Sequence, residues 1–183
     1  QALTDGQSYT MTANVSDADG NAAAEVTSSS FSVDTTLPSI SAIATGAFSW
    51  GAVLNATEDN ANGTVTVSTT GVEDGQTVTI TLNSANYTNT ITDNATTVTI
   101  TAAGLQALTD GQSYTMTANV SDAAGNAAAE VTSSAFTVNS SLPTIAAIET
   151  GAFSWGAVLN ATEDNANGTV SITTTGVDNG QTV

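Results

Sequence analysis

Residues 120–143 read VSDAAGNAAAEVTSSAFTVNSSLP, and an earlier copy, VSDADGNAAAEVTSSSFSVDTTLP, occupies residues 15–38. The copies lie 105 positions apart, and 64 of the 78 residues in 1–78 recur in 106–183 at that offset. In each copy a run with alternating apolar residues leads through a polar tetrapeptide to one of the two prolines, Pro38 and Pro143. A strand followed by such a short linker is typical of the boundary between domains. The sequence therefore predicts tandem domains of one repeating kind.

The repeat divides the chain into one complete domain and two partial ones. We expect residues 38–140 to form the complete domain, residues 1–37 the C-terminal part of a first repeat, and residues 141–183 the N-terminal part of a third. A domain of this length is near the common size for a single hydrophobic core. Because the sequence opens inside a repeat, we expect it to be a window from a longer polypeptide.

Alternation of apolar and polar residues predicts short strands in the complete domain. Four runs carry β-branched residues at every other place: 64–71, 77–84, 85–92 and 96–103. A first strand is expected at 39–46, and the two last at 112–122 and 130–138, which repeat 7–17 and 25–33. Only AAAE after each Gly-Asn and the stretch AAGLQAL are locally compatible with a helix. Seven short strands separated by turns predict an all-β fold of antiparallel sandwich domains joined end to end.

The aromatic residues fit structural roles. The connection after the first predicted strand carries Phe48, Trp50 and Val53, whose bulk is expected to seal one end of the core. Tyr9 and Tyr114 follow the turn LTDGQ, a position where sandwich domains often keep a Tyr whose hydroxyl ties the preceding loop to the backbone.

The chain has no Lys, Arg or His against 17 Asp and Glu, giving a net charge of −17. Without cations we expect no nucleic-acid partner and no contact of this segment with a membrane through a basic patch. Lack of His, Cys and Lys excludes Ser-His and Cys-His catalysis, Schiff bases and the usual zinc sites. A hydrolase with paired carboxylates is the enzyme class left, and near-identical repeats argue against it, so we expect no enzyme. Strong acidity suits an extracellular, cell-surface protein, with a halophile cytosol as the alternative.

The acidic residues fall in predicted loops, where they either form a solvated surface or bind a cation. Oxygen-only ligands suit calcium, which takes about 6 to 8 oxygens. The candidate calcium ligands are Asp5, Asp17, Asp19, Asp34, Glu58, Asp59, Glu73, Asp74, Asp110, Asp122, Asn139, Glu163, Asp164 and Asp178.

Alternating strand directions place these candidates at two domain junctions. Loops 71–76, 92–97 and 122–126 are expected at the upper end of the complete domain, and loops 54–63 and 107–111 at the lower end. The first junction then brings Asp5 and Asp34 toward Glu73, Asp74 and Asp122; the second brings Glu58, Asp59, Asp110 and Asn139 toward Asp178 and Asn179. Because unneutralised carboxylates repel each other, a bound divalent ion is expected to fix the angle between domains.

Three stretches together resemble a known family: LNATEDNANGTVTVSTTGVEDGQTVTITLN, GLQALTDGQSYTMTANVSDAAGN and FSVDTTLP. They look like the tandem bacterial immunoglobulin-like repeats of giant secreted adhesins, of the biofilm-associated and RTX types. The resemblance implies an immunoglobulin-like β-sandwich used as an extender, or stalk, with calcium stiffening the string of domains and neighbouring repeats as its partners. The chain departs from the pattern at Asn139 and Ala124, which replace Asp34 and Asp19 of the other copy.

Two alternatives to a stalk follow from the residues. Neighbouring copies in a filament or matrix would complete each other's partial domains by donating strands. A glycan- or protein-binding adhesin module would instead use an exposed aromatic cluster. Phe48 and Trp50 recur as Phe153 and Trp155, which favours packing.

Overall fold

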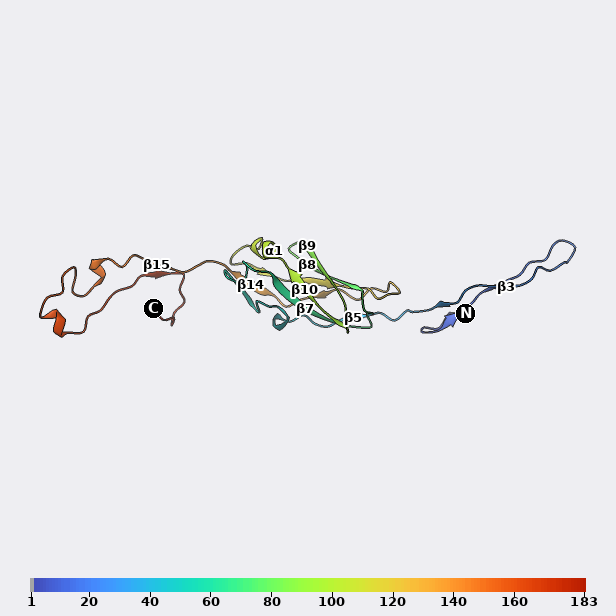
Figure 1. Ribbon diagram of the computed structural model, residues 1–183, viewed down its shortest axis with the longest axis horizontal. Coiled ribbons are helices and arrows are strands. Elements are labelled where there is room, and N and C mark those ends of the chain that lie inside the picture. The colour runs from blue at the N-terminus through green and yellow to red at the C-terminus, as the bar shows by residue number, and fades with distance from the viewer. Residues whose placement is uncertain (1) are drawn as a thin grey trace.

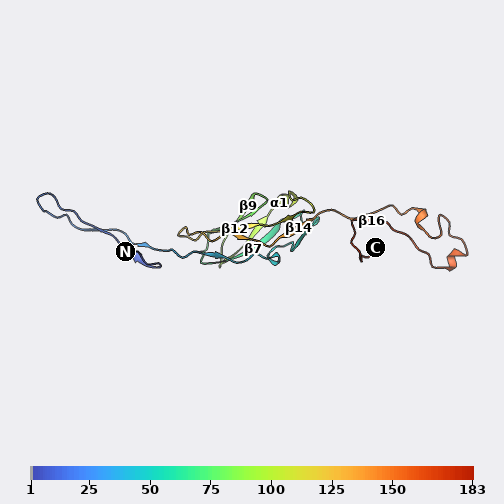
Figure 2. The ribbon, with the colours of Figure 1, turned by 180° about the vertical axis from the view of Figure 1, so that it is seen from behind.

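A computed structural model of the chain describes residues 2–183. Three parts follow one another along the long axis of the molecule: an N-terminal hairpin, a central sandwich and a C-terminal segment (Figure 1). The view from behind shows the same succession, with the sandwich between the two extended parts (Figure 2).

The first sheet of the sandwich contains β5 (Ser39–Ile40), β7 (Gly63–Thr70) and β10 (Ala95–Ile100) in the order β10-β7-β5, all antiparallel. Val65 lies opposite Val98, and both are fully buried. Thr66 lies opposite Thr97, and both are exposed. The predicted alternation is confirmed, because one face of the sheet packs in the core and the other meets solvent.

The second sheet is built around the last hairpin of the domain. β12 (Thr117–Asn119) pairs with β13 (Val131–Thr132) and with β8 (Thr77–Leu82), which pairs with β9 (Ala85–Thr90). The same hairpin continues as β11 (Ser113–Tyr114) and β14 (Phe136–Asn139), and β14 also pairs with β6 (Val53–Asn55). Two packed sheets with this strand order form an immunoglobulin-like β-sandwich, which confirms the predicted fold class.

Strand β6 is a feature that the sequence did not predict. It lies in the stretch expected to be a connection, and it runs parallel to β14, with Val53 opposite Thr137 and Asn55 opposite Asn139. This pairing turns Leu54 into the core, where it is fully buried, and leaves Val53 46% exposed. The prediction that Val53 seals the core was therefore wrong, and Leu54 has that role.

Two short stretches were compatible with a helix, and one of them forms it. α1 spans Ala102–Gln106, and the Thr101 side chain accepts a hydrogen bond from the Gly104 N–H, which caps its first turn. The AAAE stretch is extended instead, since Ala127 bridges Ser121 and the Ala128 N–H donates to the Val120 carbonyl at 2.9 Å. No helix among residues 2–183 has the length and apolar character needed to cross a membrane.

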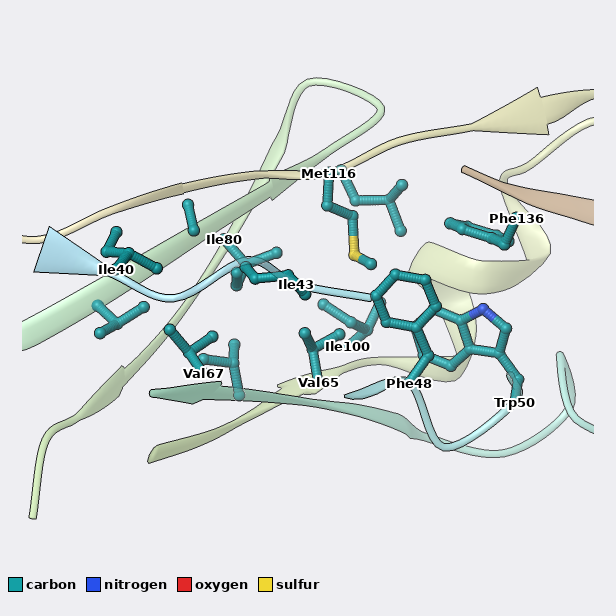
Figure 3. Packing of buried hydrophobic residues seen from close by; sticks show 14 of the residues in the cluster. Ile40, Ile43, Phe48, Trp50, Val65, Val67, Ile80, Ile100, Met116 and Phe136 are labelled. Atoms are coloured by element: carbon teal, nitrogen blue, oxygen red, sulfur yellow. The ribbon is translucent and has the colours of Figure 1, made fainter. Parts of the chain in front are cut away.

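An aromatic cluster closes the lower end of the core, as predicted for Phe48 and Trp50 (Figure 3). Both rings are 5% exposed and stack with centroids 5.4 Å apart. Phe136 meets the Trp50 ring edge-on at 5.3 Å. A Cβ built on Gly63 would lie 2.5 Å from Cζ3 of Trp50, so only glycine leaves room for the indole.

The two flanking parts repeat residues of the complete domain, but each lacks the other strands of a sandwich. The first is a hairpin in which β1 (Ser8–Tyr9) pairs with β4 (Phe31–Ser32) and β2 (Thr12–Ala13) with β3 (Val26–Thr27). The last contains β15 (Thr144–Ile145) paired with β16 (Thr174–Thr175). Three single 3₁₀ turns complete the elements: η1 (Thr45–Ala47), η2 (Thr150–Ala152) and η3 (Glu163–Asn165). Met11 is 63% exposed, whereas its equivalent Met116 is fully buried.

Candidate functional site

Asp110 holds the linker that leaves the central domain. Its carboxylate accepts hydrogen bonds from the Ser140 N–H at 2.7 Å and from the Ser141 hydroxyl at 2.5 Å. These donors, the Ser141 hydroxyl first, lower the pKa of Asp110 and outweigh the opposing desolvation. The linker backbone is therefore fixed to the turn that follows α1.

Asp5 makes the same arrangement one repeat earlier. It accepts from the Thr35 N–H at 2.5 Å and from the Thr36 hydroxyl at 2.7 Å, and the backbone donor of Thr35 contributes most to lowering its pKa. We call each set a linker clamp: Asp5 with Thr35 and Thr36, and Asp110 with Ser140 and Ser141. Both carboxylates were predicted as metal ligands, and in the structure their oxygens accept hydrogen bonds from their own linkers.

A tyrosine supports each linker clamp. The Tyr114 hydroxyl accepts a 2.9 Å hydrogen bond from the Thr109 N–H, and the Tyr9 hydroxyl accepts one of the same length from Thr4. The predicted structural role of both tyrosines is confirmed. Because Thr109 directly precedes Asp110, this bond positions the turn that carries the carboxylate.

At the upper end of the central domain, the three predicted loops meet. Glu73 accepts a hydrogen bond from the Ala123 N–H at 2.8 Å, and Asp74 accepts one from the Asp93 N–H at 2.9 Å. These two carboxylates therefore join the loop of residues 71–76 to the other two loops.

Asp122 stabilises its own loop from the inside. It is 4% exposed, and its two oxygens accept from the backbone N–H and the side-chain amide of Asn126, each at 2.8 Å. Burial acts to raise the pKa of Asp122, but the hydrogen bonds from Asn126 lower it overall. Asp17 has the same two partners in Asn21, whose side-chain amide contributes most to lowering its pKa.

The first junction brings residues of two repeats together. The Asn126 amide of the complete domain donates to the Asp34 carbonyl of the preceding repeat at 3.2 Å. Beside this contact, where the linker enters the complete domain, a Cβ built on Gly71 would lie 3.6 Å from the Pro38 Cα. A shallow pocket at this contact is lined by Asp34, Thr36, Gly71, Val72, Glu73 and Asn94. Of the predicted candidates, Asp34 and Glu73 thus share one pocket across the junction.

The remaining candidates lie in loops of single domains. Glu58 accepts from the Asn55 N–H at 3.0 Å, and Glu163 accepts from Asn160 at the same distance, so both close their own turns. Asp19, Asp59 and Asp178 lie in turns or loops, Asp164 lies in η3, and Asn139 is the last residue of β14. Among residues 2–183, no three acidic side chains lie together in a group that could hold a metal ion.

Sequence reasoning missed Asn126 and the linker hydroxyls. Asn126 follows Gly125 in a turn and carries no charge, so a search for carboxylates passes over it. The hydroxyls left a weak signal, because Thr35 and Thr36 change to Ser140 and Ser141 and keep their oxygen. The junction is thus held by neutral donors that meet carboxylates and carbonyls.

These features define a class of protein: tandem immunoglobulin-like sandwiches whose linkers are held by acidic side chains. No family model matches the chain, and no curated protein matches it. The solved structures similar to it include a bacterial immunoglobulin-like domain from the M. primoryensis ice-binding adhesin, at 28% identity and a TM-score of 0.39, covering 56% of this chain and 96% of that one.

Two larger structures are also similar at 28% identity. One is a Ca²⁺-stabilised adhesin that helps an Antarctic bacterium reach out and bind ice, with a TM-score of 0.47, covering 92% of this chain and 40% of that one. The other belongs to a 1.5-MDa bacterial ice-binding adhesin, with a TM-score of 0.41, covering 73% and 42%. The chain spans about two fifths of the length of these two structures.

Proposed function

We propose that these residues are extender repeats of a large extracellular bacterial adhesin, and that their function is reach. The observation that carries this proposal is the linker clamp, which recurs at both junctions with the same acceptor residue and equivalent donors. A linker fixed to the preceding domain cannot act as a free hinge there. Fixed linkers, with the N-terminal hairpin and the C-terminal segment on opposite sides of the sandwich along one axis (Figure 1), are the arrangement that a projecting stalk needs.

Deletion of whole repeats tests this function. Removing one repeat from the natural adhesin should shorten its projection from the cell by one step, measured by electron microscopy of the cell surface. The affinity of a distal domain for its ligand should stay the same. Loss of that affinity on deletion of a single repeat would contradict the stalk and favour a binding module.

Strand exchange between copies is a weaker explanation of the partial domains. Residues 1–37 are equivalent to 106–142, and residues 141–183 to 36–78, so together they lack any equivalent of 79–105. That missing stretch contains all of β9 and β10 and most of β8. The end segments of two copies would therefore leave the first sheet without its edge strand β10 and the second without β8 and β9.

A glycan platform built from the aromatic residues is also disfavoured. Phe48 and Trp50 are buried against Phe136 in the complete domain, so they present no ring face to a sugar (Figure 3). This supports the packing role over the binding role.

We further propose calcium at the first junction, held between Asp34 of one repeat and Glu73 of the next. The chemical type of these ligands suits a hard cation, since the shared pocket offers two carboxylates together with oxygens of Thr36 and Asn94. The number of protein ligands is too small by itself, because calcium takes about 6 to 8 oxygens and water must supply the rest. With no Lys, Arg or His in the chain, a metal ion is the means of neutralising the pair.

Thermal melting tests this proposal with the full chain in calcium, magnesium or chelator. Calcium at millimolar concentration should raise the melting temperature, because a ligand that binds only the folded state stabilises it. Asp34→Asn should reduce that rise, whereas Glu25→Gln, which changes an acidic residue of the same hairpin outside the pocket, should keep it. Equal melting temperatures in all three solutions would contradict the calcium site and show that these acidic residues form a solvated surface.

The second junction should bind calcium more weakly. Asn139 replaces Asp34 there, and Asp178 and Asn179 replace Glu73 and Asp74, so two charges are lost. Asn139→Asp in an array of complete repeats should therefore increase the calcium-dependent rise in melting temperature. An unchanged rise would contradict a role for this position.

A further inference from the structure

We infer that the parallel pair of β6 and β14 is the element of each repeat that resists tension, the contact that must break before the sandwich unfolds when it is pulled. The inference rests on the proposed function, because a stalk anchored at one end and attached at the other is pulled along its length.

The path of tension through the domain follows from the topology. Tension from the preceding repeat arrives at Pro38 and passes into β5, which is held to β7 by Ser39 and Ile40 and by the Ser41 N–H bonded to the Ser68 carbonyl. Tension from the following repeat arrives at Asn139, the last residue of β14. β5 is short and has a partner on one edge, so it is the weaker of the two anchored ends.

Beyond β5, the chain crosses to the second sheet and meets β14. The Ser134 N–H donates to the Ile43 carbonyl at 2.8 Å, and the Thr137 N–H donates to the Ala52 carbonyl at 3.0 Å. β6 then pairs with β14 from Val53 to Asn55. Between β5 and β6 the chain is also held to β7, where Phe48 bridges Val65 and the Ser49 N–H donates to the Thr64 carbonyl at 2.9 Å. Once β5 and this bridge detach, the two ends of the chain pull on β6 and β14.

The parallel direction decides how this pair is loaded. Corresponding ends of parallel strands lie at the same end of the domain, so pulling β6 toward its N-terminus and β14 toward its C-terminus slides one along the other. Sliding strains all hydrogen bonds of the pair together. An antiparallel hairpin opened from its ends would instead lose its bonds one at a time.

Both strands are also anchored by buried side chains and by neighbours. Leu54 on β6 is fully buried, and Phe136 and Val138 on β14 are 1% and 3% exposed. On its other edge β14 is held to the chain leading into β11, where the Val138 N–H donates to the Gln112 carbonyl at 2.9 Å. Sliding must therefore move core residues as well as break the ladder.

The linker clamp extends this anchoring past the end of the strand. Asp110 holds Ser140 and Ser141, which directly follow β14, so tension reaches the strand only after the clamp has yielded. The clamp and the parallel pair act in series along one line of force.

Single-molecule pulling of the full chain, in chelator so that calcium adds nothing, tests the inference. Thr137→Pro removes the N–H that bonds to Ala52, while its exposed side chain and the Val138 bond to Gln112 leave the other edge intact. Because the ladder has few bonds to share the load, we expect the unfolding force to fall by about a third.

Thr88→Pro on the edge strand β9 is the matched control. Ile91 donates to Gln76 across the pair with β8, so the N–H of Thr88, three residues away, points to the open edge. This variant should keep the unfolding force of the parent even where its melting temperature falls. Equal losses of force in the two proline variants would overturn the inference.

A change in pulling direction gives a second test without altering the pair. The chain has no cysteine, so single cysteines provide unique handles. Handles at Leu37→Cys and Leu142→Cys load β14, whereas handles at Leu37→Cys and Ala85→Cys pull on β9 and bypass it. We expect a lower force in the second geometry, and equal forces would overturn the inference. If scattering shows that an array of repeats is folded back while each domain still resists force, the stalk is contradicted and the role of the parallel pair is kept.

Discussion

The hydroxyl oxygen of Tyr114 accepts a 2.9 Å hydrogen bond from the backbone N–H of Thr109, and the turn fixed in this way carries Asp110. Tyr114→Phe should remove this bond and reduce the free energy of unfolding by about 1 kcal/mol. For a domain of this size, that corresponds to a fall of about 4 to 8 °C in melting temperature.

Tyr87→Phe is the control for this prediction. Tyr87 is also half-buried against the core and lies beside α1, and among residues 2–183 its hydroxyl accepts no hydrogen bond from a turn. Thermal melting of the two variants should separate them clearly. A Tyr114→Phe domain as stable as the Tyr87→Phe domain would show that the hydroxyl does not hold the turn.

Gly63 should not tolerate a side chain. The Cβ of Gly63→Ala would lie 2.5 Å from Cζ3 and 2.7 Å from Cε3 of Trp50, a buried ring stacked on Phe48. Overpacking of this kind costs about 1 to 3 kcal/mol. Gly46→Ala is the matched variant, because its Cβ meets nothing within 4 Å. Urea unfolding should show a marked loss for the first and little change for the second; similar midpoints would contradict the packing described.

The linker clamp should depend on pH in a defined direction. The folded-state pKa of Asp110 is lowered, first by the Ser141 hydroxyl and then by the Ser140 N–H. A lowered pKa stabilises the fold above the unfolded-state pKa of about 4, and this stabilisation is lost as pH falls through the folded-state value. Asp110→Asn should therefore melt below the parent at pH 7, and the difference should vanish in strong acid.

Asp93→Asn is the control for the loss of one charge, since Asp93 is an exposed acid in a turn away from the linker. At pH 7 it should lower the melting temperature by less than Asp110→Asn does, because the linker clamp stays intact. A difference between Asp110→Asn and the parent that persists unchanged into strong acid would show that the charged carboxylate does not hold the linker.

The sequence predicted the strands with strict alternation and missed the one without it. β7, β8 and β10 each repeat Thr and an apolar residue, and all three formed, although β8 ends at Leu82, β10 ends at Ile100 and residues 102–103 belong to α1. β6 has three residues, and its partner β14 lies far along the chain, so no local pattern indicates it. That distant partner decides which of Val53 and Leu54 faces the core, which is why the prediction for Val53 was wrong.

The sequence predicted where the candidate site lies better than it predicted what its carboxylates bind. The loops expected at the upper end of the domain do meet, because sandwich topology places alternate loops together. The sequence could not tell which carboxylates hold backbone groups: Asp5 and Asp110 accept hydrogen bonds from residues 30 positions away, which only the folded chain brings near. The metal-binding role of the acidic residues stays a prediction.

Small-angle X-ray scattering of an array of three complete repeats, each equivalent to residues 38–142, tests the stalk most directly. Strands of eight residues or slightly more rise about 3.4 Å per residue, so with loops each domain should advance the chain by about 40 Å. We predict a rod whose maximum dimension grows by one such step for each added repeat. A compact particle with domains side by side, whose maximum dimension hardly grows with repeat number, would contradict the account.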